Sequence, residues 1–226
     1  MKGAFVRDQS KFSKLREQQR EKRKNLIIDA AEMVFTERPF NEVSIRKIAK
    51  EAGITPTGIY RYFPDKQSLF FATYERDAQK LSMVVSEAIG DGTELKINEL
   101  SMKYLEFFRT HGQTFRYLAN FAVDETISED CTYMLNLATR PLFDQVERYF
   151  KKFQPDMDVR VLARAYFAAI NGALISYQKY PGKTSEQIWE HMRVIAGAIS
   201  HIFQGYLERT TAKEKPDTTG VDKETP

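Results

Sequence analysis

Cysteine, glycine and proline are scarce in this sequence, and their scarcity excludes several classes of protein. Cys131 is the only cysteine among 226 residues, so the chain can form neither an internal disulfide nor a cysteine-rich zinc site, which indicates a reducing compartment. With 11 glycines and 8 prolines, collagen-like and Pro/Gly-rich disordered chains are excluded. The content of 42% hydrophobic and 29% charged residues is typical of a globular protein with a sizeable core.

Long hydrophobic runs are also missing. The most apolar stretch, residues 161–177, includes Arg164 and Asn171, and a charge near the middle of so short a run argues against a membrane span. Residues 1–24 are polar and lack the apolar centre of a secretory signal. The sequence therefore predicts a cytoplasmic protein that has no membrane partner.

The residues that catalysis or metal binding would need are scattered. His111, His191 and His201 lie far apart in the sequence, and Gly90-Asp91-Gly92 is an isolated break rather than a phosphate-binding loop. Two pairs of adjacent carboxylates later in the chain have no partner base beside them. We therefore expect no catalytic residues, no metal site and no cofactor, and we predict that the protein is not an enzyme.

Positive charge is concentrated at the amino end. Residues 1–24 carry nine basic and three acidic side chains, and residues 1–70 carry 15 and nine. The remainder carries 19 basic and 22 acidic side chains. A positive head on a neutral-to-acidic body indicates a site for a polyanion, and a basic segment that is merely solvated is the alternative interpretation.

Hydrophobic periodicity predicts an all-α fold. The apolar residues Ile27, Ala31 and Val34 share one helical face, and Pro39 should end this first helix near Glu37. No convincing strand is present. Helices are expected over approximately residues 66–89, 93–109, 113–123, 128–153, 156–177 and 184–207.

Single residues mark the ends of the later helices. Pro141 should kink or split the helix that contains it, and Asp156 is expected to cap the next one. Thr184 and Gln187 have the spacing of a capping box that opens the last helix. Residues 210–226 have few large apolar side chains and are predicted to be a disordered tail.

Residues 44–66 carry the most specific functional signal. Ser44 is a good N-cap for a short helix, Gly53 can supply a left-handed turn residue, and Thr55-Pro56 opens a second short helix. Two short helices joined by such a turn are typical of a helix-turn-helix, whose second helix enters the major groove of DNA.

The same region resembles the TetR family of bacterial transcriptional regulators. The matching pieces lie in residues 30–35, 48–55 and 59–70, so the resemblance covers about a fifth of the chain. We therefore expect an all-α protein with a basic extension over residues 1–20 and, as the resemblance implies, a helix-turn-helix DNA-binding domain over residues 21–66. A helical ligand-binding and dimerisation domain over residues 67–209 and the tail over residues 210–226 would follow.

The resemblance also implies which residues touch DNA. Arg46 would reach a base edge such as that of guanine, and Lys66 would bind phosphate. Packing in the core is the alternative role for Tyr62. The full set of expected DNA-binding residues is Ser44, Arg46, Thr55, Pro56, Thr57, Gly58, Tyr60, Arg61, Tyr62 and Lys66.

Two residues depart from the family pattern, and the first of these departures bears on the expected base contacts. Family members often carry glycine at the position of Thr57, whereas here Gly58 follows it, and Pro39 stands where a glycine commonly ends the first helix. The basic segment 1–24 is longer than many relatives need. Our hypothesis is that this segment adds phosphate or minor-groove contacts.

One helix-turn-helix reads few base pairs, so we expect a homodimer on a palindromic double-stranded DNA operator. Small residues on the last two helices would let them pack closely across a two-fold axis, and a role inside the subunit's own core is the alternative. The predicted interface comprises Ala165, Ala169, Gly172, Ala173, Ser176, Ala196 and Ile199.

Residues 70–153 contain nine phenylalanines and five tyrosines. The resemblance implies a cavity there for a small apolar or amphipathic effector, and ordinary core packing is the favoured interpretation of each aromatic residue taken alone. The predicted ligand-binding residues are Tyr74, Tyr104, Phe107, Phe108, Phe115, Phe121, Met134 and Asn171, and Tyr117, Phe143, Asn120, Asn136 and Arg140 are further candidates.

Together these patterns predict a dimeric transcriptional regulator, a repressor associated with the nucleoid. A ligand would release it from DNA by favouring a form whose recognition helices no longer lie about 34–36 Å apart. The alternative is a TetR-like DNA-binding protein that acts through a protein partner without a small-molecule effector.

Overall fold

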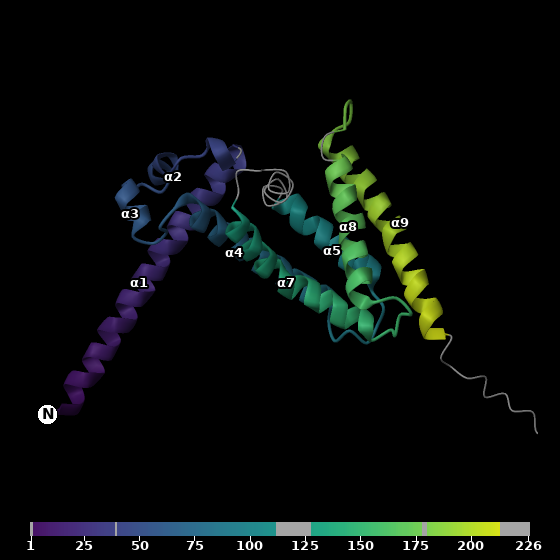
Figure 1. The fold of residues 1–226 in the computed structure, drawn as a ribbon, viewed down its shortest axis with the longest axis horizontal. Helices are drawn as coiled ribbons and strands as arrows, with labels where there is room; N and C mark the ends of the chain where they lie inside the picture. The colour runs from purple at the N-terminus through teal and green to yellow at the C-terminus, as the bar shows by residue number, and fades with distance from the viewer. Residues whose placement is uncertain (1, 39, 112–127, 178–179, 213–226) are drawn as a thin grey trace, which may run out of the picture. The chain divides into compact units, whose positions relative to one another are not determined.

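The computed structural model describes residues 2–38, 40–111, 128–177 and 180–212, and within them every regular element is helical (Figure 1). The all-α prediction is confirmed. In chain order the elements are α1 (Lys2–Glu37), the 3-10 helix η1 (Phe40–Glu42), α2 (Ile45–Glu51), α3 (Pro56–Tyr60), α4 (Lys66–Ile89), α5 (Ile97–Thr110), α7 (Glu129–Lys151), α8 (Val159–Tyr177) and α9 (Ser185–Ala212).

The chain forms two compact units. The first comprises residues 1–79 with 112–138, and the second comprises residues 80–111 with 139–226. Both boundaries fall inside helices, α4 and α7, so each of these helices contributes to both units. The domain boundary expected at residues 66/67 coincides with the first residue of α4.

Local chemistry fixes the helix ends of the first unit as predicted. The Ser44 hydroxyl accepts a hydrogen bond from the Lys47 amide at 3.3 Å and caps α2, and Gly53 turns the chain with φ of +66°. The Thr55 hydroxyl accepts from the Gly58 amide at 3.1 Å and caps α3. At the start of α4, the Ser68 amide donates to the Asp65 carboxylate at 2.7 Å.

One apolar core holds α1, α2, α3 and α4 together in the first unit. Ile48 of α2, Ile59 of α3 and Leu69 of α4 are fully buried in it. Phe35 and Phe40 stack with ring centroids 5.9 Å apart, and Phe70 meets both rings edge-on. Because each short helix is anchored by a buried isoleucine, its opposite face must point outward.

Buried hydroxyl groups join the helices of the second unit. Tyr166 of α8 hydrogen-bonds to Ser101 of α5 at 2.8 Å, and Ser200 of α9 donates to the same serine at 2.7 Å. Burial raises the pKa of Tyr166, so its hydroxyl stays protonated. The Thr184–Gln187 capping box forms as predicted, with hydrogen bonds of 3.0 and 3.2 Å.

Several predicted helix bounds in this part of the chain were wrong. The helix expected from residue 93 begins at Ile97, because the Thr93 amide and hydroxyl both bond to the Asp91 carboxylate and because the Tyr149 hydroxyl bonds to the Lys96 amide at 2.6 Å. These contacts hold residues 93–96 in a loop.

One further correction concerns the cap of α8, and another concerns the end of the last helix. Asp158 rather than Asp156 caps α8, accepting from the Arg160 amide at 2.8 Å. The last helix continues to Ala212, so the start of the expected tail is helical. Pro141 does not split α7, which is one continuous helix, and a kink there stays a prediction. Apolar residues buried on both sides of the proline stabilise the helix.

Among the described residues, α8 alone has the length and hydropathy of a membrane-spanning helix. Leu162, Tyr166 and Ile170 on one side of it are buried in the second unit, where α8 packs against α9. Core helices of globular proteins have the same properties, so α8 does not indicate a membrane span.

Candidate nucleic-acid interface

The recognition helix α3 presents a polar face to solvent. Ile59 is fully buried, and Phe63, just after the helix, is 4% exposed. These two side chains hold α3 against the core, so that its polar face points away from the core. Thr57 and Arg61 are exposed, and the side chain of Tyr60 is 53% exposed. The expected DNA-reading face is therefore accessible.

The amino end of α3 is shaped for close approach. Pro56 occupies the first turn and the Thr55 side chain caps it, so the helix begins directly before Thr57. A Cβ atom at Gly58 would lie 3.4 Å from the Thr55 hydroxyl and 3.5 Å from Ile54, which is ordinary contact. The fold alone thus does not require glycine at position 58.

Arg46 lies in the first turn of α2 and is exposed, as a residue that reads a base edge must be. Ser44, one of the predicted contacts, is exposed as well and caps the same helix. Lys47 instead forms a salt bridge of 3.0 Å with Glu37, at the end of α1. That pairing favours a role on the solvated surface for Lys47.

Lys66 has a structural role that the sequence did not indicate. Its ammonium group donates to the carbonyl oxygens of Phe40 at 2.7 Å and Val43 at 3.0 Å, and it lies 4.1 Å from the centroid of the Phe40 ring. The residue therefore holds η1 against the start of α4. A phosphate contact by Lys66 stays a prediction.

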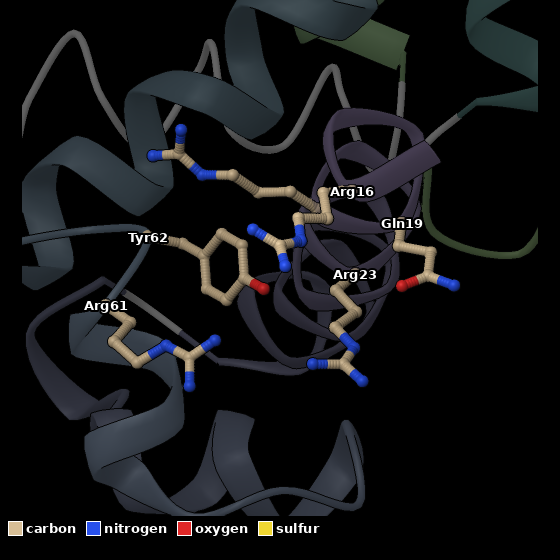
Figure 2. Close-up of a pocket in the computed structure, with 6 residues that line it drawn as sticks. Arg16, Gln19, Arg23, Arg61 and Tyr62 are labelled. Atoms are coloured by element: carbon tan, nitrogen blue, oxygen red, sulfur yellow. The ribbon is translucent and has the colours of Figure 1, made fainter. Parts of the chain in front are cut away.

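Arginines of α1 converge with the residues that follow α3. Arg61 lies over the ring of half-buried Tyr62, 5.7 Å from its centroid, and both line a pocket of about 200 Å³ whose other lining residues are Arg16, Gln19, Arg20 and Arg23. In Figure 2, Tyr62 reaches toward the arginine-bearing face of α1. Sequence reasoning assigned Arg61 and Tyr62 to DNA but did not connect them with particular residues of the basic segment.

Residues 27–73 match the family model of the bacterial regulatory proteins of the tetR family. The segment that contains the helix-turn-helix therefore belongs to the DNA-binding domain of the tetR family. The match begins in the buried part of α1, contains the whole helix-turn-helix and ends in α4.

Solved structures share the fold of this chain beyond the matched segment. A tetR-family regulator from Streptomyces coelicolor is 21% identical, with a TM-score of 0.61 over 88% of this chain and 91% of that one. FadR from Bacillus subtilis, solved in complex with stearoyl-CoA, is 16% identical, with a TM-score of 0.66 over 77% and 96%. PfmR from Thermus thermophilus is 15% identical, with a TM-score of 0.60 over 77% and 97%.

Four of the predicted ligand-binding residues lie in the second unit. The Tyr104 hydroxyl donates to the Asn171 side chain at 2.8 Å, and the Tyr104 and Phe108 rings meet edge-on with centroids 5.0 Å apart. Phe107 packs edge-on against Phe108 at 5.3 Å. Of the others, Tyr74 is buried in the first unit and Met134 is 40% exposed, while Phe115 and Phe121 lie outside the described residues.

The predicted dimer residues divide by exposure. Ala173 and Ala196 are 5% and 0% exposed in the single chain, so they are already covered within the subunit. Ala165 and Ser176 are exposed, and the remaining candidates Ala169, Gly172 and Ile199 are half-buried. Sequence reasoning missed the larger apolar residues on the outer sides of α8 and α9, which are Val161, Ile175, Val194 and Ile202.

Proposed function

We propose that this protein is a dimeric, sequence-specific transcriptional repressor that binds a palindromic DNA operator in the cytoplasm. A small apolar or amphipathic ligand would release it. The outward face of α3 carries this proposal: Ile59 is buried while Thr57, Tyr60 and Arg61 remain exposed. A recognition helix held in this way can enter the major groove without disturbing the core.

Each residue of this face has a chemical task. Arg46 can form two parallel hydrogen bonds to guanine, a contact that discriminates by about 1–3 kcal/mol against a wrong base. Thr57 offers a hydroxyl and a methyl group to base edges, and Gly58 leaves room for the DNA. Tyr60 and Arg61 can donate to phosphate oxygens, which position the helix without reading the sequence.

Exposed apolar residues on α8 and α9 support the dimer. Val161, Ile175, Val194 and Ile202 are 55–67% exposed in the single chain. Burying one such side chain fully is worth about 1.5–3 kcal/mol. Two outer faces of this kind, one from each subunit, would form a four-helix bundle around a two-fold axis.

We propose that an apolar or amphipathic ligand contacts the aromatic cluster of the second unit, whose rings are buried in the single chain. Tyr104, Phe108 and Phe167 form a continuous set of rings, and the amide of Asn171 beside them is a polar anchor. Stearoyl-CoA, the ligand of the structurally similar FadR, combines a long apolar chain with a charged head. We propose a ligand of that general class.

α4 is the structural connection for release. Its residues 66–79 belong to the first unit and its residues 80–89 to the second. A ligand that binds the second unit can therefore act on the DNA-binding unit through a single continuous helix. The ligand must prefer the form that does not bind DNA by about 1–3 kcal/mol, because equal binding to both forms would change nothing.

Selection of operators from random duplex DNA with the purified protein is the direct test. We expect a palindrome whose half-sites are about one helical turn apart. Arg46→Ala should relax the preference at one base pair per half-site, whereas Lys50→Ala, on the exposed side of the same helix, should keep the wild-type preference. Failure to enrich any duplex at low salt would refute the proposed function.

A further inference from the structure

The pocket between α1 and the end of α3 holds four arginines and little else. Arg16, Arg20 and Arg23 belong to α1, and Arg61 is the residue that directly follows α3. In the part of the chain that the structure describes, none of these arginines forms a salt bridge. Positive groups gathered without carboxylates make a site for an anion.

The arginines continue the inward face of α1. Counting back from buried Ile27 by four, seven and eleven residues reaches Arg23, Arg20 and Arg16. This spacing keeps all four residues on one side of a helix of 3.6 residues per turn. The side of α1 that packs on the helix-turn-helix with apolar residues therefore becomes cationic as α1 extends beyond the core toward Lys2 (Figure 1).

Acidic residues of the same segment lie elsewhere around α1. Glu17 and Glu21 are about 100° and 140° around the helix from Arg16. They do not line the pocket, whose remaining polar groups are the Gln19 amide and the Tyr62 hydroxyl. Guanidinium groups can bind phosphate oxygens through two parallel N–H groups, and the tyrosine hydroxyl and glutamine amide can donate further bonds.

We propose that Arg16, Arg20, Arg23 and Arg61 bind phosphates of the operator backbone next to the bases that α3 reads. This inference rests on the proposed function, and it adds a second DNA-binding element outside the helix-turn-helix. The pocket is continuous with the proposed reading face, because Arg61 and Tyr62 directly follow α3. The occupant is therefore the backbone of the same duplex.

The dimensions of α1 fit this partner. Arg16 and Arg23 are seven residues apart, about 10 Å along a helix that rises 1.5 Å per residue. Duplex DNA carries one charge per about 1.7 Å of its axis, so the row can meet several phosphates. A helix also orders the arginines before binding, which reduces the entropy lost on association. Tyr62, beneath the Arg61 guanidinium, restricts that side chain in the same way.

A pair of charge-matched variants tests the proposal. Arg16→Gln/Arg20→Gln/Arg23→Gln removes three charges from the pocket, and Lys11→Gln/Lys14→Gln/Lys22→Gln removes three from the opposite side of α1. Affinity is measured by fluorescence anisotropy on two forms of the selected operator. One form is trimmed to its edges, and the other carries one further helical turn, about 10 base pairs, on each side.

We expect the arginine variant to weaken binding to the longer duplex at least tenfold. The slope of log Kobs against log salt should fall by about two to three units, since each lost phosphate contact is worth about 0.9. The lysine variant should change both quantities less, and the base preference of both variants should match that of the wild-type protein. Far-UV circular dichroism checks that both variants stay folded.

Equal losses in the two variants would show that net charge steers association without a defined site, which overturns the proposal. Unchanged binding by the arginine variant overturns it too. Hydroxyl-radical footprinting of the wild-type protein gives a separate reading, because the proposal requires backbone protection next to the recognised bases. A wild-type protein that binds no duplex at all would instead refute the proposed function.

Discussion

Replacing Lys66 by methionine tests whether this lysine stabilises the DNA-binding unit. Methionine keeps the aliphatic stem but removes the ammonium, and with it the hydrogen bonds to the carbonyl oxygens of Phe40 and Val43 at 2.7 and 3.0 Å. A hydrogen bond with a charged group contributes about 1.5–3 kcal/mol, and part of this is regained when water reaches the half-buried carbonyls. Losing the contact with the Phe40 ring, 4.1 Å away, adds a smaller cost.

We therefore expect Lys66→Met to lower the free energy of unfolding by about 2 kcal/mol. For a chain of this size that corresponds to a Tm about 4–8 °C lower. Urea unfolding followed by circular dichroism measures the first quantity and a thermal scan the second. Lys50→Met is the control, because Lys50 is exposed and its side chain has no partner among the described residues.

The same variant separates the two roles considered for Lys66. A residue that only binds phosphate would leave stability unchanged and reduce the salt slope of DNA binding by about 0.9. A structural residue would lower stability, with DNA binding regained at temperatures where the variant is folded. Stability equal to that of the wild-type protein would therefore refute the role that we derive from the geometry.

Three further predictions concern the proposed function. Gly58→Ala should raise the free energy of unfolding, measured in urea, by up to about 0.5 kcal/mol. The same variant should bind the operator more weakly in fluorescence anisotropy, and wild-type affinity would contradict a close approach of the DNA to Gly58. Ile175→Glu should shift the dimer toward monomer in sedimentation equilibrium, whereas Met83→Glu, at an equally exposed apolar residue, should not; a dimer that persists would exclude this interface. Tyr104→Phe should lower the free energy of unfolding by about 1 kcal/mol, because the hydrogen bond to Asn171 is lost, and equal urea midpoints would contradict that contribution.

Much of the DNA-binding unit could be predicted from sequence because local chemistry determines it. Ser44 and Thr55 each cap a helix by bonding to an amide three residues ahead, and Gly53 adopts the left-handed conformation that few other residues tolerate. None of these interactions depends on a distant part of the chain. Tyr60, which the resemblance assigned to DNA, is exposed and lies about 100° around this short helix from buried Ile59.

Interactions between distant residues were not predictable in this way. The sequence around Thr93 predicts the start of a helix. The Lys96 amide, however, donates to the hydroxyl of Tyr149, far along the chain, and this bond helps to keep residues 93–96 in a loop. Lys66 reads as a surface cation, yet its partners lie 23 and 26 residues earlier. The arginine row of α1, by contrast, could have been predicted from the sequence. Counting back from Ile27 at 3.6 residues per turn places these arginines on the same side of the helix as Ile27.

Contacts at both ends of its first-unit segment bind α4 to the rest of the DNA-binding unit. Lys66 fixes its first residue to η1, and Arg76 is hydrogen-bonded and ion-paired with Asp29 and Glu32 of α1. Burial lowers the pKa of Arg76, but the two carboxylates outweigh it and leave the pKa raised, so the guanidinium stays charged at any physiological pH.

A displacement of α4 by a ligand would therefore carry α1 with it. α1 holds both the core of the helix-turn-helix and the proposed row of phosphate-binding arginines, so both DNA-binding elements would move together. The free energy of ligand binding must then offset the loss of all DNA contacts, those of the helix-turn-helix and those of the arginine row. Operators that contact the arginine row should therefore need a higher ligand concentration for release. Measuring release from the trimmed and the extended operator at equal starting occupancy tests this coupling; equal ligand requirements would show that α1 and α4 are not coupled in this way.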